Sequence, residues 1–217
     1  MIRYFVGVPR SGKTTIACKI MKKHLRKKNF LNLKRIKYKY HFSNFETNYG
    51  LSNYFDDSML GKFKLPEYSY IALDESGLSF NSRKFASLPF GVIENFKKHG
   101  HEHQDIDLFS QTWDDTDKQL RDLAEEIWVI RKIGPLSFAR CVYKRIGIDE
   151  QTKQLAYQHY WKSILFQLLP FQPKQFIFCF RPLYYKYFDS FEPINMSVLP
   201  CPNGKEWFTT MNYLNVK

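Results

Sequence analysis

Apolar residues along the chain gather into short runs that alternate with amphipathic or polar stretches. The run IRYFV at residues 2–6 and the run YIAL at residues 70–73 have the length and the β-branched or aromatic content of buried strands. The amphipathic stretch after the first run places Ile16, Ile20 and Met21 on one helical face and lysines elsewhere. Strands are predicted at residues 2–6, 70–73, 106–109, 126–132 and 138–145, with helices directly after residue 15, at residues 88–98 and at residues 114–126.

This alternation of strands and helices predicts an α/β fold with a mostly parallel sheet and helices on both faces. Residues 30–68 carry basic and aromatic clusters, and we expect only short strands and loops there. From residue 150 the pattern changes, because six of the ten prolines lie between Pro170 and Pro202 among aromatic residues. We therefore divide the chain into a core at residues 1–150 and a C-terminal extension at residues 151–217, which either packs around the core or docks a partner.

The segment GVPRSGKT at residues 7–14 matches the pattern G-x-x-x-x-G-K-[ST] at every fixed position. Its two glycines let the backbone turn tightly and approach a ligand closely. Amides of residues 10–14 can then converge on phosphate oxygens at the start of a helix, where the helix dipole also favours an anion. Lys13 would reach the β- and γ-phosphates, and Thr14 would offer its hydroxyl to Mg²⁺. The predicted ligands are ATP and Mg²⁺, and the predicted nucleotide-binding residues are Gly7, Pro9, Arg10, Ser11, Gly12, Lys13, Thr14 and Thr15.

Two acids close the predicted strand at residues 70–73. An acid at the end of a strand near a phosphate loop can hold Mg²⁺, a role that we assign to Asp74 together with Thr14. Glu75 follows and could orient or deprotonate the attacking water. Gln111 follows the predicted strand at residues 106–109, where its amide could sense the γ-phosphate or position the water. The ordered series therefore predicts hydrolysis as well as binding.

The chain has a net charge of +12, and this excess is concentrated near the phosphate loop. Residues 1–50 contain 13 Lys and Arg but a single acid, Glu46, whereas the rest of the chain is neutral. So concentrated a basic stripe favours a polyanionic partner, either nucleic acid or an anionic membrane surface. The alternative is a solvated helix face that keeps the protein soluble. The lysines expected to contact such a polyanion are Lys22, Lys23, Lys27 and Lys28.

Other kinds of site find little support. The cysteines are widely spaced without a C-x-x-C pair, so we expect reduced thiols and no structural zinc. The HGHEH segment at residues 99–103 lacks the further ligands of a zinc site and is predicted to be a solvated basic loop. No signal peptide is expected, and no apolar run reaches the ~18 residues of a transmembrane helix. The absence of an N-K-x-D motif disfavours a GTPase.

The order of these motifs resembles the zonular occludens toxin-like family, whose members include the filamentous-phage assembly ATPases. The resemblance lies within residues 2–132 and is carried by GVPRSGKTT, YIALDESG, FKKHGHEHQDID and LFSQTWDDTDKQLRDL. It implies a RecA-like core of the additional-strand, catalytic-glutamate kind. Lys13 and Thr14 match the family's P-loop residues. Asp74 and Glu75 match its strand-end acids, and Gln111 matches its polar sensor.

The resemblance also implies a role in moving or exporting single-stranded DNA during virion assembly, with phage or host inner-membrane assembly proteins as partners. Many relatives continue into a transmembrane helix and an outer domain, and this sequence shows neither. We therefore expect a location in the host cytoplasm, or at the periphery of the inner membrane, without a transmembrane segment of its own.

The leading hypothesis is a homo-oligomeric ATPase that couples hydrolysis to the handling of single-stranded DNA. Such motors complete each site with an arginine from the neighbouring subunit. The first candidate is Arg121, on the helix predicted at residues 114–126, and the second is Arg83. Two other functions stay open. A small-molecule or nucleotide kinase shares the loop but normally needs a lid with paired arginines, and a P-loop scaffold would bind ATP without turnover.

Overall fold

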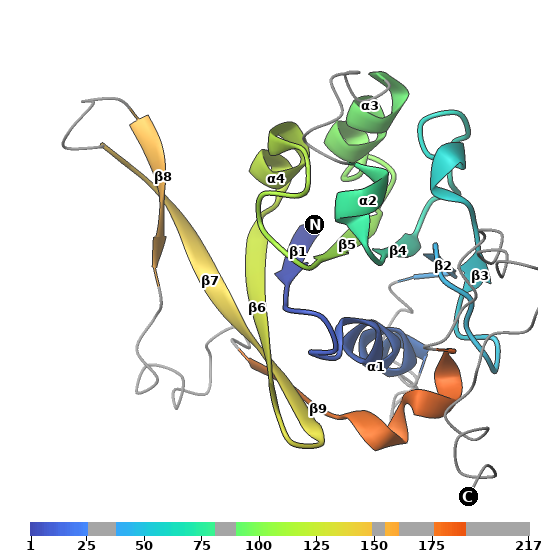
Figure 1. Ribbon diagram of the computed structural model, residues 1–217. Coiled ribbons are helices and arrows are strands. Elements are labelled where there is room, and N and C mark those ends of the chain that lie inside the picture. The colour runs from blue at the N-terminus through green and yellow to red at the C-terminus, as the bar shows by residue number, and fades with distance from the viewer. Residues whose placement is uncertain (26–37, 81–89, 149–154, 161–175, 190–217) are drawn as a thin grey trace, which may run out of the picture.

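The computed structural model describes residues 1–25, 38–80, 90–148, 155–160 and 176–189 of the 217-residue chain (Figure 1). The helices are α1 (Lys13–Leu25), α2 (Ser76–Ser79), α3 (Phe90–Lys98) and α4 (Lys118–Leu123). The strands are β1 (Ile2–Val6), β2 (Tyr40–Ser43), β3 (Asn53–Tyr54), β4 (Ser69–Leu73), β5 (Asp105–Ser110), β6 (Glu126–Ile133), β7 (Leu136–Ile148), β8 (Leu155–Tyr160) and β9 (Phe176–Phe180). Short 3₁₀ helices lie at Asp57–Met59, Arg181–Leu183 and Tyr185–Tyr187.

The strands form one sheet in the order β3-β2-β4-β5-β1-β6-β7-β8, and β9 also pairs with β7. Every pair from β3 to β6 is parallel, whereas β7 pairs antiparallel with β6, β8 and β9. Strand β5 lies between β1, which leads into the phosphate loop, and β4, which ends at Asp74. The predicted α/β fold with a mostly parallel sheet is confirmed.

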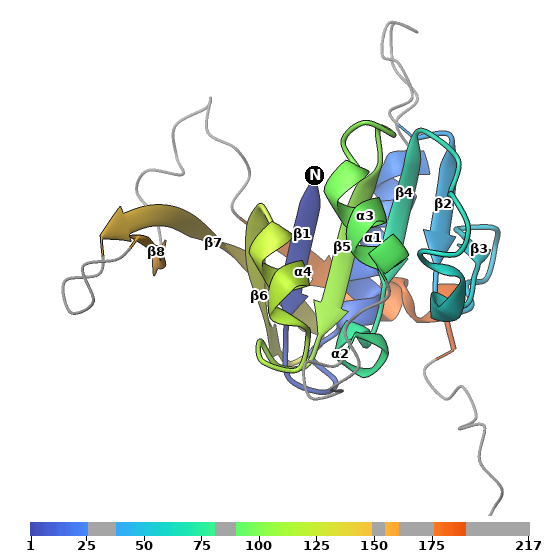
Figure 2. The same ribbon diagram turned by 90° about the horizontal axis from the view of Figure 1, so that it is seen from above.

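Helices cover both faces of the parallel part of the sheet. Figure 2 shows α1 on one face and α3 and α4 on the other. Because side chains alternate along a strand, β1 sends Phe5 into the core cluster under α1 and Tyr4 into the cluster under α3 and α4. In β4, Tyr70 and Ile71 divide in the same way. The strands therefore read as continuous apolar runs because both of their faces are buried.

Residues 176–189, here called the C-terminal strap, run from β7 across α1 (Figure 1). At its start Cys179 is fully buried, with its Sγ 3.7 Å from the Thr15 carbonyl oxygen of α1. Further along, the ammonium of Lys22 donates a hydrogen bond to the Tyr187 hydroxyl at 2.6 Å. The Tyr187 carbonyl accepts from the amide of Asn48, in the β2–β3 connection, at 2.8 Å. The strap therefore links the two sides of the sheet over α1.

Helix α4 is shorter than the helix that the sequence predicts at residues 114–126. Asp117 lies outside α4, and its Oδ1 accepts a hydrogen bond from the Gln119 amide at 2.8 Å, as an N-cap residue does. Ala124 is extended, and it leads directly into β6. The expectation of a helix from residue 114 to residue 126 is therefore wrong at both ends. Within the part of the chain that the structure describes, no helix is both long and apolar enough to cross a membrane.

Candidate nucleotide-binding site

The phosphate loop follows β1 at the carboxyl ends of the parallel strands, the edge at which open α/β sheets bind ligands. The Gly7 amide donates a hydrogen bond to the Ser110 carbonyl at 3.1 Å, which ties the loop to β5. The Ser11 amide donates to the Val8 carbonyl at 3.1 Å, which closes the turn. Helix α1 then begins at Lys13, so that its first amides face the inside of the loop.

Two features of the loop fit a bound phosphate group. A Cβ at residue 7 would lie 2.5 Å from Ser11 Oγ, and Gly12 has a φ of 93°, so both positions require glycine. The Ser11 hydroxyl is fully buried and has no hydrogen-bond partner among the described residues. A buried donor of this kind is normally satisfied by a partner, and a phosphate oxygen would supply one.

Lys13 lies inside the loop and is only 6% exposed. Its ammonium donates a hydrogen bond to the Gly7 carbonyl at 3.2 Å and lies 3.7 Å from Oε1 of Glu75. The charge that is expected to meet the phosphates is therefore held beside the carboxylate that is expected to act on water.

The two predicted Mg²⁺ ligands lie together. Thr14, in the first turn of α1, donates a hydrogen bond from its hydroxyl to Oδ2 of Asp74, at the end of β4. Burial raises the pKa of Asp74, and the hydrogen bond from Thr14 opposes that shift. A hydroxyl next to a carboxylate is a hard oxygen donor set of the type that Mg²⁺ takes in nucleotide sites. The residues present therefore fit the metal.

Asn44, directly after β2, holds the Asp74 backbone in place. Its Oδ1 accepts from the Asp74 amide at 2.7 Å, and its Nδ2 donates to the Asp74 carbonyl at 2.8 Å. Nothing in the sequence pattern marked Asn44, because its role depends on β2 becoming the neighbour of β4.

Glu75 and Gln111 also meet. Nε2 of Gln111 lies 3.1 Å and 3.0 Å from the two carboxylate oxygens of Glu75, and donates to them. Glu75 has a φ of 47° and a ψ of 38°, which turns the chain out of β4 and into α2. Because β5 is the neighbour of β4, the residues that follow the two strands come together at the same edge of the sheet. Lys13, Thr14, Asp74, Glu75 and Gln111 therefore lie in one cluster.

Arg121, the first arginine candidate, contacts two residues outside this cluster. Arg121 pairs with Asp114 of its own chain at 3.0 Å, and its guanidinium lies 5.2 Å from the centroid of the Trp113 ring. The Arg121 side chain is only 14% exposed, whereas that of Asp114 is 87% exposed, so Arg121 packs on its own subunit while its partner faces solvent. Arg83, the second candidate, lies outside the described residues.

Two residues that the sequence did not point to donate hydrogen bonds to backbone carbonyls of the phosphate loop. The Ser137 hydroxyl of β7 donates to the Ser11 carbonyl at 2.5 Å. Arg181 of the strap donates from Nη1 to the Arg10 carbonyl at 3.3 Å and from Nη2 to the Gly134 carbonyl. No short motif could have found them, because they lie more than a hundred residues beyond the loop.

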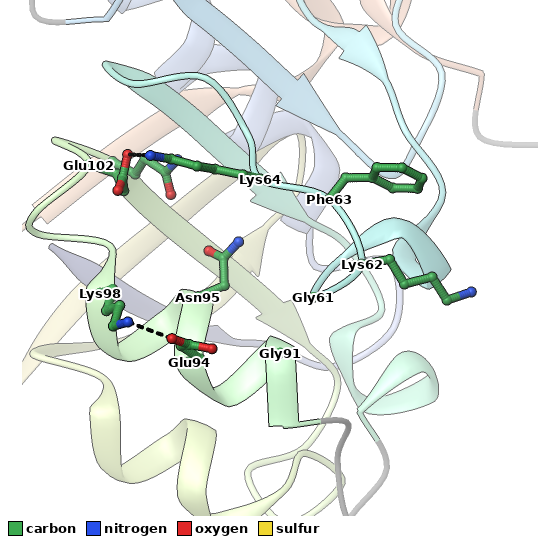
Figure 3. A pocket seen from close by; sticks show the side chains of 10 residues that line it. Gly61, Lys62, Phe63, Lys64, Gly91, Glu94, Asn95, Lys98 and Glu102 are labelled. Carbon is green, nitrogen blue, oxygen red and sulfur yellow. Dashed lines mark hydrogen bonds and ion pairs between the residues drawn. The ribbon is translucent and has the colours of Figure 1, made fainter.

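A hollow lies elsewhere, between residues 61–64 and α3 (Figure 3). It measures about 320 Å³, and Gln104, just before β5, places it toward the amino ends of the strands. Charged side chains around it pair with one another, Lys64 with Glu102 at 2.9 Å and Lys98 with Glu94 at 2.5 Å (Figure 3). We do not place the nucleotide there.

Among the described residues, no group of three or more histidine, cysteine or acidic side chains could hold a metal ion. In the HGHEH segment, the His103 ring stacks on the Tyr68 ring.

A phosphate loop after β1, with an extra strand between it and the strand of the acids, decides the type of fold. The chain has a RecA-like P-loop NTPase fold. No family model matches the sequence, and no curated protein matches it.

Three solved structures illustrate the similarity of this P-loop fold to known proteins. The N-terminal domain of zonular occludens toxin from Neisseria meningitidis is 18% identical, with a TM-score of 0.48 over 75% of this chain and 94% of that one. The genome-packaging NTPase B204 of Sulfolobus turreted icosahedral virus 2, in complex with ATP-gammaS, is 13% identical, with a TM-score of 0.44 over 74% and 96%. The DNA-packaging ATPase B204 of Sulfolobus turreted icosahedral virus is 13% identical, with a TM-score of 0.40 over 75% and 98%. The first of these carries the name of the family that the order of motifs resembles.

Proposed function

We propose that this protein is an Mg²⁺-dependent ATPase that acts as an oligomeric motor on single-stranded DNA, in the assembly or export of a phage. One observation carries the catalytic part of the proposal. The side chains expected to bind phosphate, metal and water converge from the loop, β4 and β5, although they lie far apart in the sequence.

Binding would use the loop. The amides of residues 10–14 and the ammonium of Lys13 would hold the triphosphate, and its γ-phosphate would compete with Glu75 for that ammonium. Thr14 and Asp74 would hold Mg²⁺, which neutralises charge on the β- and γ-oxygens when it is bound.

Hydrolysis would use Glu75 as the general base. Its carboxylate would accept a proton from water while the water oxygen bonds to the γ-phosphorus. The bond from the γ-phosphorus to the bridging oxygen breaks in the same displacement, so ADP and inorganic phosphate are the products. Gln111 would fix the carboxylate for this step, because its amide nitrogen contacts both carboxylate oxygens.

The motor part of the proposal has separate support. Arg121 is proposed to enter the site of a neighbouring subunit, a move that requires it to leave both Asp114 and the Trp113 ring. The basic N-terminal region suits a polyanion. Lys22 is already bonded to Tyr187, and Lys27 and Lys28 lie outside the described residues. The helix lysines therefore remain a proposed contact, and virion assembly would place the protein inside the host cell near its inner membrane.

ATP turnover with and without single-stranded DNA tests this function. We expect turnover in the absence of DNA and clear stimulation by it. A rate that rises instead with a small phosphate acceptor would identify a kinase. Tight ATP binding without turnover under either condition would leave a binding scaffold.

A further inference from the structure

Strands β6, β7 and β9 present one open face on the side of the sheet away from α1. Ser137, Ala139 and Cys141 of β7 are buried on the α1 side, so the alternate residues of β7 point the other way. The core cluster under α3 and α4 draws its strand residues from β1, β4 and β5. The face of β6, β7 and β9 therefore extends past the region that those helices cover.

The strand register sets aromatic and basic side chains side by side on this face. Phe138 of β7 lies between Arg131 of β6 and Phe178 of β9. Arg140, two residues along β7, lies between Val129 and Phe176 in the same way. Directly opposed side chains on neighbouring strands are close enough to contact one another. None of these six positions carries a carboxylate, and they are here called the aromatic–arginine platform.

The platform is exposed to solvent and contains a hollow. Phe178 is 62% exposed, and its ring centroid lies 5.9 Å from that of Phe176, so the two rings form an apolar patch. The Arg140 guanidinium lies 5.7 Å from the centroid of the Phe176 ring. A hollow of about 230 Å³ opens between Val129, Arg131, Phe138 and Arg140, so both guanidinium groups line one depression next to an aromatic ring.

We propose that the aromatic–arginine platform binds single-stranded nucleic acid. Proteins that bind single strands stack bases on aromatic rings and hold the phosphates with cations, and an open sheet face with exposed aromatics is one known form of such a surface. Here Phe138 and Phe178 supply the rings, and Arg131 and Arg140 supply the charge. This inference rests on the proposed function, and it adds a DNA contact on the face of the sheet opposite to α1 and its lysines.

Charge disfavours a two-fold symmetric contact with a second copy of the chain and favours nucleic acid as the occupant. In a symmetric contact the same patch meets itself, which would set the arginines of one copy against those of the other. Like charges that face each other across an interface are unfavourable. A polyanion would bring charge opposite to that of the two arginines.

The platform is also joined to the nucleotide loop. Ser137 lies between two platform-side positions of β7, and its hydroxyl binds the Ser11 carbonyl. Phe180 ends β9 on the platform side, and the next residue, Arg181, binds the Arg10 carbonyl. Strand β7 and the residue after β9 therefore contact the loop, and the platform face of the two strands would contact DNA.

The test is the binding of an end-labelled single-stranded oligothymidylate, followed by fluorescence anisotropy over a series of salt concentrations. Phe178→Ala should weaken binding about 5- to 150-fold, because stacking contributes ~1–3 kcal/mol per base, and the salt dependence should stay the same. The double variant Arg131→Ala/Arg140→Ala should lower the slope of log affinity against log salt by ~1.4, because each phosphate contact on a single strand contributes ~0.7.

Matched controls lie on other surfaces. Phe63→Ala removes a phenylalanine that is 65% exposed, and Lys62→Ala/Lys97→Ala removes two exposed charges near α3. These variants should bind as the wild type does. Thermal unfolding of every variant checks that it is folded.

The possible results separate this inference from the proposed function. Wild-type protein that binds DNA, together with platform variants that bind equally well, would overturn the platform and leave the DNA motor standing. Wild-type protein that binds no DNA would overturn both. A fall in oligomer mass on Phe178→Ala, with unchanged DNA affinity, would show that a second copy covers the face and would also overturn the proposal.

Discussion

Single residues at the site hold one another across four segments of the chain. Glu75 is the centre of this arrangement, with the Gln111 amide on its carboxylate and the Lys13 ammonium 3.7 Å away. Asp74 is held by Asn44 through the backbone and by Thr14 through the side chain. Polar side chains that are fixed before the reaction need little reorganisation during it.

Glu75→Gln should separate binding from hydrolysis. The amide keeps the size of the side chain but cannot take a proton from water, so turnover should fall by ~10²–10⁴-fold while ATP affinity stays close to that of the wild type. Steady-state ATPase rates and calorimetric ATP titration give the two quantities. Glu67→Gln, at an exposed acid, is the control and should change neither. Equal turnover in the two variants would remove Glu75 from the mechanism.

Several of these residues could be predicted from the sequence for a local reason. Lys13 and Thr14 belong to one short motif, and Asp74 and Glu75 directly follow an apolar strand, so their neighbours in the chain identify them. Asn44, Ser137 and Arg181 could not be predicted. Their partners lie on other strands, and no local pattern states which strands become neighbours.

At the scale of elements, β7 and the C-terminal strap support the loop and α1. Strands β1, β4 and β5 could be predicted because they are buried on both faces and read as apolar runs. Strand β9 was missed because FIFCF lies among prolines, where no spacing predicted its pairing with β7. The predicted start of α4 was wrong because an acidic residue can either cap a helix from outside or lie in its first turn, and Asp117 is the cap.

Ser137→Ala should weaken the loop. The substitution leaves the Ser11 carbonyl without its buried donor, which costs ~1–3 kcal/mol of the free energy of unfolding, and ATP affinity should also fall. Urea unfolding and ATP titration measure these effects. Ser69→Ala is a matched control, because the Ser69 hydroxyl, also fully buried, donates to the Pro66 carbonyl at 2.5 Å away from the loop. Similar ATP affinities in both variants would contradict a supporting role for β7.

At the scale of the whole molecule, the described residues supply the phosphate loop, the two acids and Gln111 in one cluster, whereas the arginine proposed to act on a neighbouring site lies elsewhere on the subunit. Arg121 rests on Asp114 and Trp113 of its own subunit. If the proposed arginine of a neighbouring subunit completes the site, turnover should depend on protein concentration.

Mixing two inactive variants tests this dependence. Lys13→Ala removes the phosphate-binding cation and Arg121→Ala removes the proposed neighbouring arginine, so each variant alone should lose turnover. In a mixed oligomer, an intact Lys13 site of one subunit meets an intact Arg121 of the next, and activity should return in part. Lys13→Ala mixed with Glu75→Gln is the control. Lys13 and Glu75 act in the same site of one subunit, so every site in this mixture lacks one of them and no activity should return. Failure of the first mixture to recover would show that Arg121 does not act in trans.

The left-handed backbone of Glu75 sets stability against reactivity. This conformation costs a non-glycine residue roughly 1–2 kcal/mol. Glycine avoids that cost but loses about 0.5–1 kcal/mol of stability, because its unfolded chain has more conformational freedom. Glu75→Gly should therefore unfold at a higher temperature than Glu75→Ala, the reverse of the usual order, and both should lack turnover. If the alanine variant is the more stable, the backbone carries no such cost. If the glycine variant is the more stable, Glu75 is retained at a cost in stability, as expected of a residue whose side chain serves the reaction.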